Sequence, residues 1–173
     1  FEEGRYKQPS PVQIVAELCH MVNHDSDSSH IAITLGANRA PIDSVRAIQN
    51  ASSGMTGWCI AEYLYRFGHN VTVIAGKTSK DPSFSLPDVI RAGGPDDMLE
   101  MCLKVAKSKP NAWVHAAAVL DYYTKPIDGK KASGDDSWVL ELHPGPKHIQ
   151  ELAPHIGDAR RIGFKLETGV TLD

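Results

Sequence analysis

The sequence has 173 residues and a mass of 18.8 kDa, enough for one domain with a substantial hydrophobic core. Its 18 Lys and Arg residues against 21 Asp and Glu give a net charge of −3, which excludes a broad basic surface for nucleic acid or an anionic membrane. We expect a soluble, cytoplasmic protein, because the sequence has neither a run of about 18 apolar residues nor the apolar stretch of a signal peptide.

The cysteines and paired histidines argue against a structural metal or disulfide framework. Cys19, Cys59 and Cys102 are odd in number and widely spaced, and we expect buried free thiols. His20 and His24 lie four residues apart on a predicted helix, but the sequence offers no further ligands near them. We therefore interpret them as surface histidines.

Hydrophobic periodicity gives the elements in chain order. Short apolar, β-branched runs between polar or glycine-rich segments indicate buried strands, whereas apolar residues three and four positions apart indicate helices. The expected elements are a helix over 12–22, a strand over 30–36, a helix that starts near Ser53 and ends at Gly68, strands over 70–76 and 88–92, a helix within 93–110, and a strand over 112–119.

The remaining segment is less regular. It predicts a polar loop over 125–136, a half-exposed strand over 137–143, a helix over 146–156 and a final strand over 160–166. Alternation of strands and helices along the whole chain predicts an α/β protein with a Rossmann-like three-layer fold and a mainly parallel sheet.

The segment between the first strand and the next helix is unusually long. About 17 residues separate Leu35 from the expected helix start, whereas such connections usually have about 2–6 residues. Ligands of open parallel sheets bind at the carboxyl ends of the strands, where this segment begins. It offers Gly36 for close approach to the backbone, Arg46 for negative oxygens, and Asn50 as donor and acceptor. These residues predict a binding segment for an anion.

The start of the following helix supports the same interpretation. Ser52 and Ser53 are expected to cap the helix, and Gly54 and Gly57 leave backbone N–H groups bare beside its positive end. Ordinary capping and a surface loop are the structural alternative. The segment does not carry the G-x-G-x-x-G fingerprint of dinucleotide sites, because Asn38 replaces the second glycine.

A second candidate segment, HAAAVLDYY (115–123), lies at the carboxyl end of another predicted strand. Ala117 and Ala118 would let a flat ligand approach the backbone, and Asp121 would stand at the rim. The alternative is that the alanines only pack beneath a helix and that Asp121 caps a turn. We expect His115 to be a hydrogen-bonded core histidine.

Four motifs occur in a fixed order. The run from PIDSVR (41–46) to NASSGMTG (50–57) is followed by HAAAVLDYY, by Lys130–Lys131 in a flexible loop, and by GFKLET (163–168). In this order they resemble phosphopantothenoylcysteine synthetase, the ligase family of coenzyme A biosynthesis, over about residues 30–169. A lysine pair alone is more often a solvated surface, so the order of the motifs carries the resemblance.

The resemblance implies a two-step reaction. A nucleoside triphosphate, CTP or in some members ATP, activates the carboxylate of 4′-phosphopantothenate as an acyl-nucleotide and releases pyrophosphate, with Mg²⁺ bridging the phosphates. The amine of cysteine then displaces the nucleotide. The resemblance implies catalytic roles for Asn50, as an oxyanion donor, and for Arg46 and Lys131, as phosphate ligands. It implies nucleotide binding by Gly36, Ser52, Ser53, Gly54, Gly57, Ala117, Ala118, Asp121, Lys130, Phe164 and Lys165.

The resemblance also predicts the domain organisation. Residues 1–29 are similar to the tail of a flavin-dependent decarboxylase that precedes the ligase in fused proteins, and FMN would be bound only by that upstream domain. Residues 30–173 are similar to a ligase domain that lacks the final helix and strand of the family. A homodimer and small-molecule substrates are expected.

Two segments depart from the family's pattern. GANRA (36–40) replaces G-G-T-x-E, and GPKHI (145–149) replaces N-P-D-I, so the phosphate loop and the selection of the base do not transfer to this chain. A nicotinamide- or flavin-dependent Rossmann oxidoreductase is one alternative, and a degenerate domain that binds nucleotide without catalysis is another. Against the oxidoreductase, Lys77 follows the second strand where an acidic residue would bind ribose.

Overall fold

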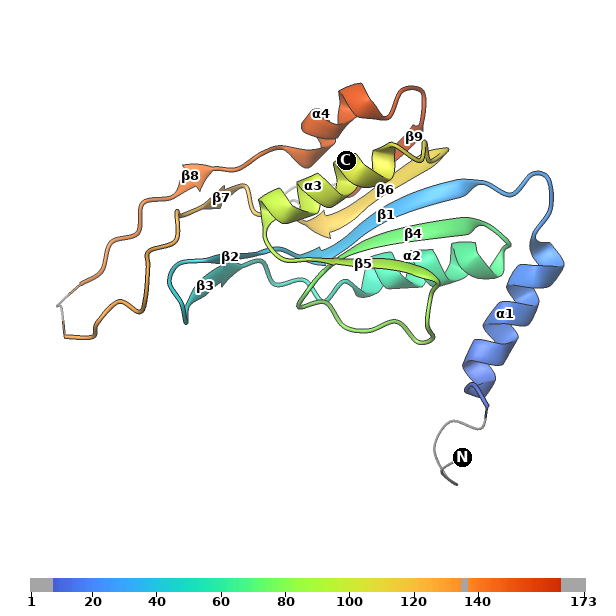
Figure 1. Cartoon of the computed structure of the whole chain (residues 1–173), viewed down its shortest axis with the longest axis horizontal. Coiled ribbons are helices and arrows are strands. Elements are labelled where there is room, and N and C mark those ends of the chain that lie inside the picture. Colours follow the sequence, from blue (N-terminus) through green and yellow to red (C-terminus); the bar gives the residue numbers. More distant parts are fainter. Residues whose placement is uncertain (1–7, 135–136, 166–173) are drawn as a thin grey trace, which may run out of the picture.

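Five parallel strands form the central sheet in the part of the chain that the computed structural model describes, residues 8–134 and 137–165. Across the sheet the order is β5 (Asp88–Ala92), β4 (Asn70–Gly76), β1 (His30–Ala37), β6 (Ala112–Ala118) and β9 (Arg160–Gly163). Every neighbouring pair is parallel (Figure 1). The predicted strands in these five regions are confirmed.

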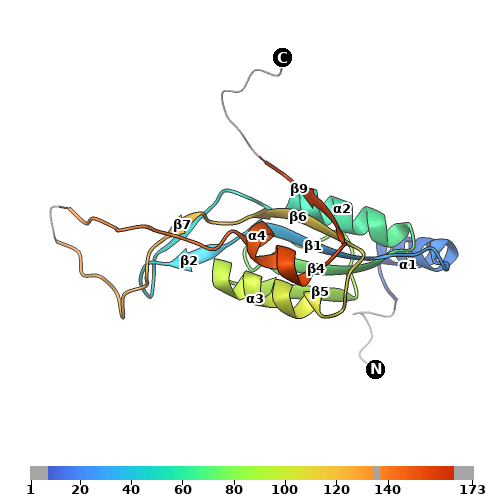
Figure 2. The same cartoon turned by 90° about the horizontal axis from the view of Figure 1, so that it is seen from above.

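Helices cover both faces of the sheet (Figure 2). On one face lies α2 (Met55–Arg66), and α1 (Pro11–Asn23) packs beside it. On the other face lie α3 (Pro95–Ala106) and the short α4 (His148–Leu152). A 3-10 turn, η1 (Ala153–His155), follows α4. The predicted three-layer α/β fold is confirmed.

The hydrophobic core is divided into two clusters, because the strands are buried on both faces. From β1, Ile33 and Leu35 pack in the cluster that contains Trp58 of α2, whereas Ala32 packs in the cluster that contains Trp113 of β6. Both tryptophans are almost completely buried. Burial on both faces explains why these strands are continuous apolar runs in the sequence.

Two glycines allow neighbouring elements to pack very closely against β1. A Cβ atom on Gly57, in the first turn of α2, would lie 2.3 Å from Cβ of Leu35, and one on Gly76, at the end of β4, would lie 2.1 Å from the carbonyl oxygen of Ala37. Both distances are far below van der Waals contact. The helix and the neighbouring strand therefore reach β1 only because these side chains are absent.

The ends of α2 confirm one capping prediction and correct another. Gly68, with φ +87°, follows the last turn as predicted. At the other end, the helix begins at Met55 and its N-cap is Gly54, with φ +78° and no side-chain cap. The prediction that Ser52 and Ser53 cap the helix is wrong, because the left-handed glycine turns the chain into the helix; only a 3.4 Å contact from Met55 N to Ser53 Oγ remains.

The long segment after β1 contains a small hairpin of its own. β2 (Arg39–Pro41) pairs antiparallel with β3 (Ala47–Gln49), and a second short pair joins β7 (Tyr122–Tyr123) to β8 (His143–Pro144). Both pairs extend beyond the carboxyl ends of the central strands (Figure 1). The strand predicted over 137–143 is wrong, since only its last residue pairs, and alternation without a partner strand does not make a sheet.

The cysteine prediction holds only in part. All three thiols are free, but Cys102 alone is buried, while Cys19 is half-buried and Cys59 is exposed on α2. In the described residues no helix has both the length and the apolar character needed to cross a membrane.

Candidate functional site

The order of the strands places a switch point at the middle of the sheet. From β1 the chain proceeds through α2 to β4 on one side, whereas β6 lies on the other side of β1. The two connections thus diverge at the carboxyl ends of β1 and β6. In open parallel sheets a crevice forms at this position, and ligands bind in it.

A pocket of about 310 Å³ occupies this position. Thr34 of β1 and His115 and Ala117 of β6 form its floor, and these strands are in register with Thr34 opposite His115. The pocket is lined by Thr34, His115, Ala117, Val119, Asp121, Pro146, Lys147, His148, Ile149, Phe164 and Lys165. The structure therefore brings together four residues that the sequence analysis assigned to a nucleotide: Ala117, Asp121, Phe164 and Lys165.

Two buried histidines lie in the wall of this pocket. His115 is 7% exposed and His148 6%, and neither Nε2 of His115 nor either ring nitrogen of His148 has a hydrogen-bond partner among the described residues. The prediction of a hydrogen-bonded His115 is therefore wrong for Nε2, because this atom is buried in the pocket wall beside His148, where no donor or acceptor of the described residues pairs with it. Buried polar atoms without partners are rare and call for a ligand or a specific reason.

Burial also fixes the charge of these rings. Desolvation, with smaller contributions from His148 and Arg161, lowers the pKa of His115 from 6.5 to about 4. Desolvation likewise lowers the pKa of His148; the nearby Pro95 carbonyl, which does not meet hydrogen-bond geometry with the ring, and the Asp96 carboxylate oppose this shift in part. At neutral pH His115 is therefore uncharged, and its unpaired Nε2 can donate to or accept from a ligand, according to the tautomer.

The rim of the pocket is charged and open to solvent. Lys147 Nζ donates to Asp121 Oδ1 at 2.5 Å, and both side chains are more than half exposed. Phe164 N donates to the carbonyl of His115 at 3.4 Å, which holds the end of β9 beside the pocket. The rest of the motif GFKLET, residues 166–168, lies outside the described residues.

Asn50 connects the long segment to the pocket. Its Nδ2 donates to the carbonyls of Ala118 and Val119, both at 3.1 Å. The segment after β1 is thereby fixed against the carboxyl end of β6, beside the pocket wall that Ala117 and Val119 form. The Nδ2 donor of Asn50, which an oxyanion role would require, therefore donates to backbone carbonyls at the end of β6 in this structure.

Arg46 and Lys131 meet at a buried carboxylate farther along the same edge. Arg46 Nη1 donates to Asp43 Oδ2 at 2.5 Å and to the carbonyl of Lys131 at 3.4 Å, and Lys131 N donates to Asp43 Oδ2 at 3.2 Å. The Arg46 guanidinium also lies 5.1 Å from the ring centre of Trp138. Two residues that are 85 positions apart and were both predicted as phosphate ligands are thus neighbours.

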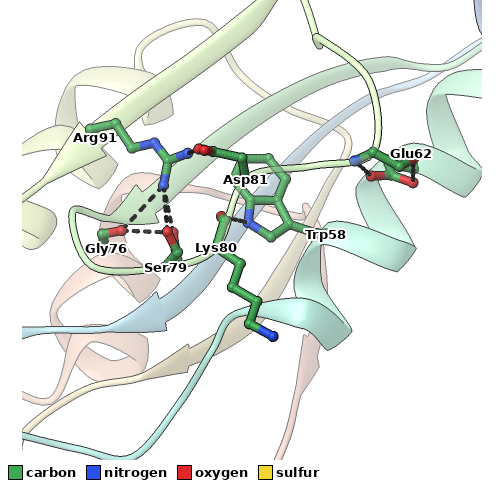
Figure 3. A network of polar contacts seen from close by, with 8 residues as sticks. Trp58, Glu62, Gly76, Ser79, Lys80, Asp81 and Arg91 are labelled. Atoms are coloured by element: carbon green, nitrogen blue, oxygen red, sulfur yellow. Dashed lines mark hydrogen bonds and ion pairs between the residues drawn. The ribbon is translucent and has the colours of Figure 1, made fainter. Parts of the chain in front are cut away.

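The glycines at the start of α2 form a third part of the site. Gly36, with φ +77°, and Gly54 pack against each other and against Ser79 of the β4–β5 loop. In Figure 3 the Arg91 guanidinium holds this loop, through Ser79 Oγ at 2.6 Å and Asp81 at 2.6 Å, while Trp58 Nε1 donates to the carbonyl of Lys80. The loop therefore closes over the N-terminus of α2, a contact that the sequence did not indicate.

The predicted residues thus form three groups at or beyond the carboxyl ends of the central strands. The pocket holds Ala117, Asp121, Phe164 and Lys165; Asn50 and Ala118 join it to the long segment; and Arg46 and Lys131 lie at the buried Asp43. Ser52, Ser53, Gly54 and Gly57 lie at the start of α2, and Lys130 is exposed on its loop. Sequence reasoning missed the histidine pair and the role of Asp43 in joining two segments.

The described residues contain no group of three or more His, Cys, Asp and Glu side chains that could hold a metal ion.

A doubly wound sheet with a pocket at its switch point defines a Rossmann-like domain for a small-molecule ligand. The particular family follows from comparison with known proteins: the chain belongs to the family described as the DNA/pantothenate metabolism flavoprotein C-terminal domain, whose model matches residues 26–173.

Named relatives agree with this family. The chain is 37% identical over 176 residues to the Coenzyme A biosynthesis bifunctional protein CoaBC of Thermococcus kodakarensis, covering 99% of this chain and 42% of the relative. The DNA/pantothenate metabolism flavoprotein of Streptococcus pneumoniae is similar in structure, with a TM-score of 0.74, 27% identity, and coverage of 83% of this chain and 72% of that one.

A crystal structure of the C-terminal domain of CoaBC matches with a TM-score of 0.68 and 30% identity, covering 82% of this chain and 66% of the other. The chain spans 42% of the length of the Thermococcus relative and 41% of the Bacillus subtilis one.

Proposed function

We propose that this domain joins 4′-phosphopantothenate to cysteine through an acyl-nucleotide, the ligase step of coenzyme A biosynthesis. The observation that carries the proposal is the position of the predicted groups at or beyond the carboxyl ends of the central strands, with Asn50 bonded beside the pocket, in a chain whose relatives are bifunctional proteins of coenzyme A biosynthesis. We also propose that it functions beside a decarboxylase domain, which agrees with the relatives being named bifunctional proteins.

The pocket at the switch point suits the base of the nucleotide. Its volume of about 310 Å³ is in the range of small-ligand sites, and Ala117 leaves the floor low enough for a planar ring. The phosphates would then extend along the rim toward the N-terminus of α2, where N–H groups and the helix dipole favour negative charge. Phe164 and Lys165 would close the opposite side.

The activation step requires a carboxylate oxygen to attack a phosphorus atom while pyrophosphate leaves. Arg46 and Lys131 would bind the negative oxygens of the triphosphate and stabilise the charge that moves onto the leaving group. Asn50 would hold the acyl-nucleotide at the end of β6, through a turn of its amide away from the carbonyls of Ala118 and Val119. Magnesium, when bound with the triphosphate, would neutralise phosphate charge, and Asp121 is the carboxylate of the pocket rim that fits as a further ligand.

Two finer parts of the proposal concern the co-substrate and the assembly. We expect CTP in preference to ATP, and we expect a homodimer. The oxidoreductase alternative is not favoured, because the glycine fingerprint is missing and Lys77 follows β4.

The test is the release of pyrophosphate when the protein is mixed with 4′-phosphopantothenate and either CTP or ATP, before and after addition of cysteine. Asn50→Ala is expected to lower the overall rate about 100-fold without loss of folding, the usual cost of removing one such stabilising group. Lys131→Gln is expected to slow pyrophosphate release itself. Normal turnover by both variants would remove these two residues from the site, and no pyrophosphate with either nucleotide would contradict the ligase assignment.

A further inference from the structure

The strongest unexplained feature of the site is the carboxylate of Asp43. Its side chain is completely buried, although it carries a charge and lies in the turn of a two-stranded hairpin, where polar side chains usually face water. Resting on the proposed ligase function, we propose that Asp43 is a positioning residue, which holds Arg46 and the loop of Lys131 together so that both cations face one triphosphate.

The first oxygen of Asp43 organises its own turn. Oδ1 accepts from Val45 N at 2.8 Å and from Arg46 N at 2.6 Å. These local bonds reverse the chain between β2 and β3 and set the direction in which the Arg46 side chain leaves the backbone.

The second oxygen joins this turn to a distant segment. Oδ2 accepts from Arg46 Nη1 at 2.5 Å and from Lys131 N at 3.2 Å. One atom therefore fixes both the guanidinium of Arg46 and the backbone of Lys131. A neutral acceptor would hold these donors less strongly, because hydrogen bonds to a charged oxygen are about twice as strong.

Backbone bonds continue the junction on both sides. Ser44 N donates to the carbonyl of Gly129 at 3.0 Å, and Ile127 N donates to the carbonyl of Ile42 at 2.9 Å. The loop of Lys131 is therefore docked on the hairpin over residues 127–131, rather than projecting alone. Asp43 is the charged centre of this junction.

The ionisation of Asp43 is consistent with this role. Burial opposes its charge, but the three N–H donors of Val45, Arg46 and Lys131, together with the Arg46 guanidinium, lower its pKa from 3.8 to about 2. The carboxylate therefore remains charged at every pH at which the reaction would be assayed.

Asp43→Asn separates the two functions of the side chain. Asparagine keeps one acceptor oxygen for the turn but replaces Oδ2 by an NH₂ group, which would face the donors of Arg46 and Lys131. We expect pyrophosphate release to slow about 100-fold, the effect of displacing a catalytic group by about 1 Å, while kcat/KM for cysteine stays unchanged because it reports only the second step. Asp128→Asn, which removes an exposed carboxylate from the same loop, is the matched control and is expected to keep the wild-type rate.

Amide hydrogen exchange on the wild-type protein provides a test that does not depend on the folding of a variant. The Lys131 amide should exchange about 10-fold more slowly than that of Lys130, for which the described residues supply no acceptor, and Asp43→Asn should abolish the difference. Equal exchange of the two amides in the wild type, or a folded Asp43→Asn protein with the rate of the Asp128→Asn control, would overturn the proposal. A wild-type protein that releases no pyrophosphate would instead reject the ligase function.

Discussion

Two polar clusters at the same edge of the sheet differ in how their atoms are paired. Around Asp43 both carboxylate oxygens are buried, and each accepts two hydrogen bonds from the chain. In the pocket, three ring nitrogens of His115 and His148 are buried without a partner among the described residues. The carboxylate of the first cluster is fully paired and fixes two segments, whereas the second cluster leaves atoms that a bound molecule or water would pair.

This difference has an energetic meaning. A fully paired buried group contributes to folding in the absence of any ligand, and its removal leaves donors unpaired. An unpaired buried polar group lowers the stability of the ligand-free protein, and a ligand that forms a hydrogen bond with it removes this penalty. Variants in the two clusters should therefore have opposite effects on stability.

The largest loss of stability is expected for Asp43→Ala. This change removes four accepted hydrogen bonds and leaves the Arg46 guanidinium and the Lys131 amide without their buried acceptor. Calorimetry without ligand should show a larger fall in melting temperature for Asp43→Ala than for the variants of His115, His148 and Asp81 described next. If Asp43→Ala melts with the wild type, the contrast between the two clusters is wrong.

The pH dependence of stability should identify His115. Its pKa is about 4 in the folded protein and 6.5 when unfolded, so the unfolded state binds more protons between these values. The stability that the neutral ring contributes is complete above pH 6.5 and is lost as the pH falls toward 4. Between pH 7 and pH 5 this loss should be about 1.5 kcal/mol, after a discount for the open side of the pocket.

Urea unfolding at the two pH values measures this loss, with His115→Gln as the comparison. The variant has no titrating ring at position 115. Its free energy of unfolding should therefore change less than that of the wild type between pH 7 and pH 5. An identical pH dependence in both proteins would show that His115 is not held neutral by burial.

A change at His148 should have the opposite sign to that at Asp43. His148→Leu replaces two unpaired nitrogens by apolar atoms, and we expect the ligand-free protein to gain about 1 kcal/mol. The increase in melting temperature on addition of CTP should become smaller at the same time. His155→Leu, an exposed histidine of η1, is the control; a loss of stability at His148 similar to that at Asp43 would contradict the comparison.

The smallest effect is expected where an Arg–Asp pair is exposed. Asp81 is 90% exposed in its ion pair with Arg91, although the distance of 2.6 Å is close to that of the Arg46–Asp43 pair. Asp81→Asn should change the free energy of unfolding by no more than about 0.5 kcal/mol, measured in urea at low salt. A larger loss of unfolding free energy would mean that ion pairing alone, without burial, determines how much these residues contribute to stability.

Much of the architecture could be predicted because it depends on local patterns. The inner strands β1 and β4 are buried on both faces and therefore appear as apolar runs, and the helices carry their apolar residues at regular spacing. The strand predicted over 137–143 failed because alternation describes one strand, whereas a sheet also requires a partner. The prediction of a serine N-cap failed because Gly54, in a left-handed conformation, occupies the N-cap position. The sequence Ser-Ser-Gly is compatible with either arrangement.

The site was predictable to a similar degree and for similar reasons. Motifs at the carboxyl ends of strands located Asn50, Ala117 and Asp121, because the topology of a parallel sheet brings such ends together. The junction at Asp43 was not predictable, since it depends on a hydrogen bond between residues 88 positions apart. The unpaired nitrogens depend on side-chain orientation, which no sequence pattern specifies.

The close contacts at Gly57 and Gly76 limit how proteins of this architecture can diverge. Since a single methyl group at either position would collide with Leu35 or with the backbone at Ala37, random substitution there is eliminated regardless of the nucleotide that is used. In the pocket lining, Lys147 and Ile149 have exposed side chains that can change without such a collision. We therefore expect evolutionary change in base preference to accumulate on that side of the pocket, while the frame beneath it tolerates almost no variation.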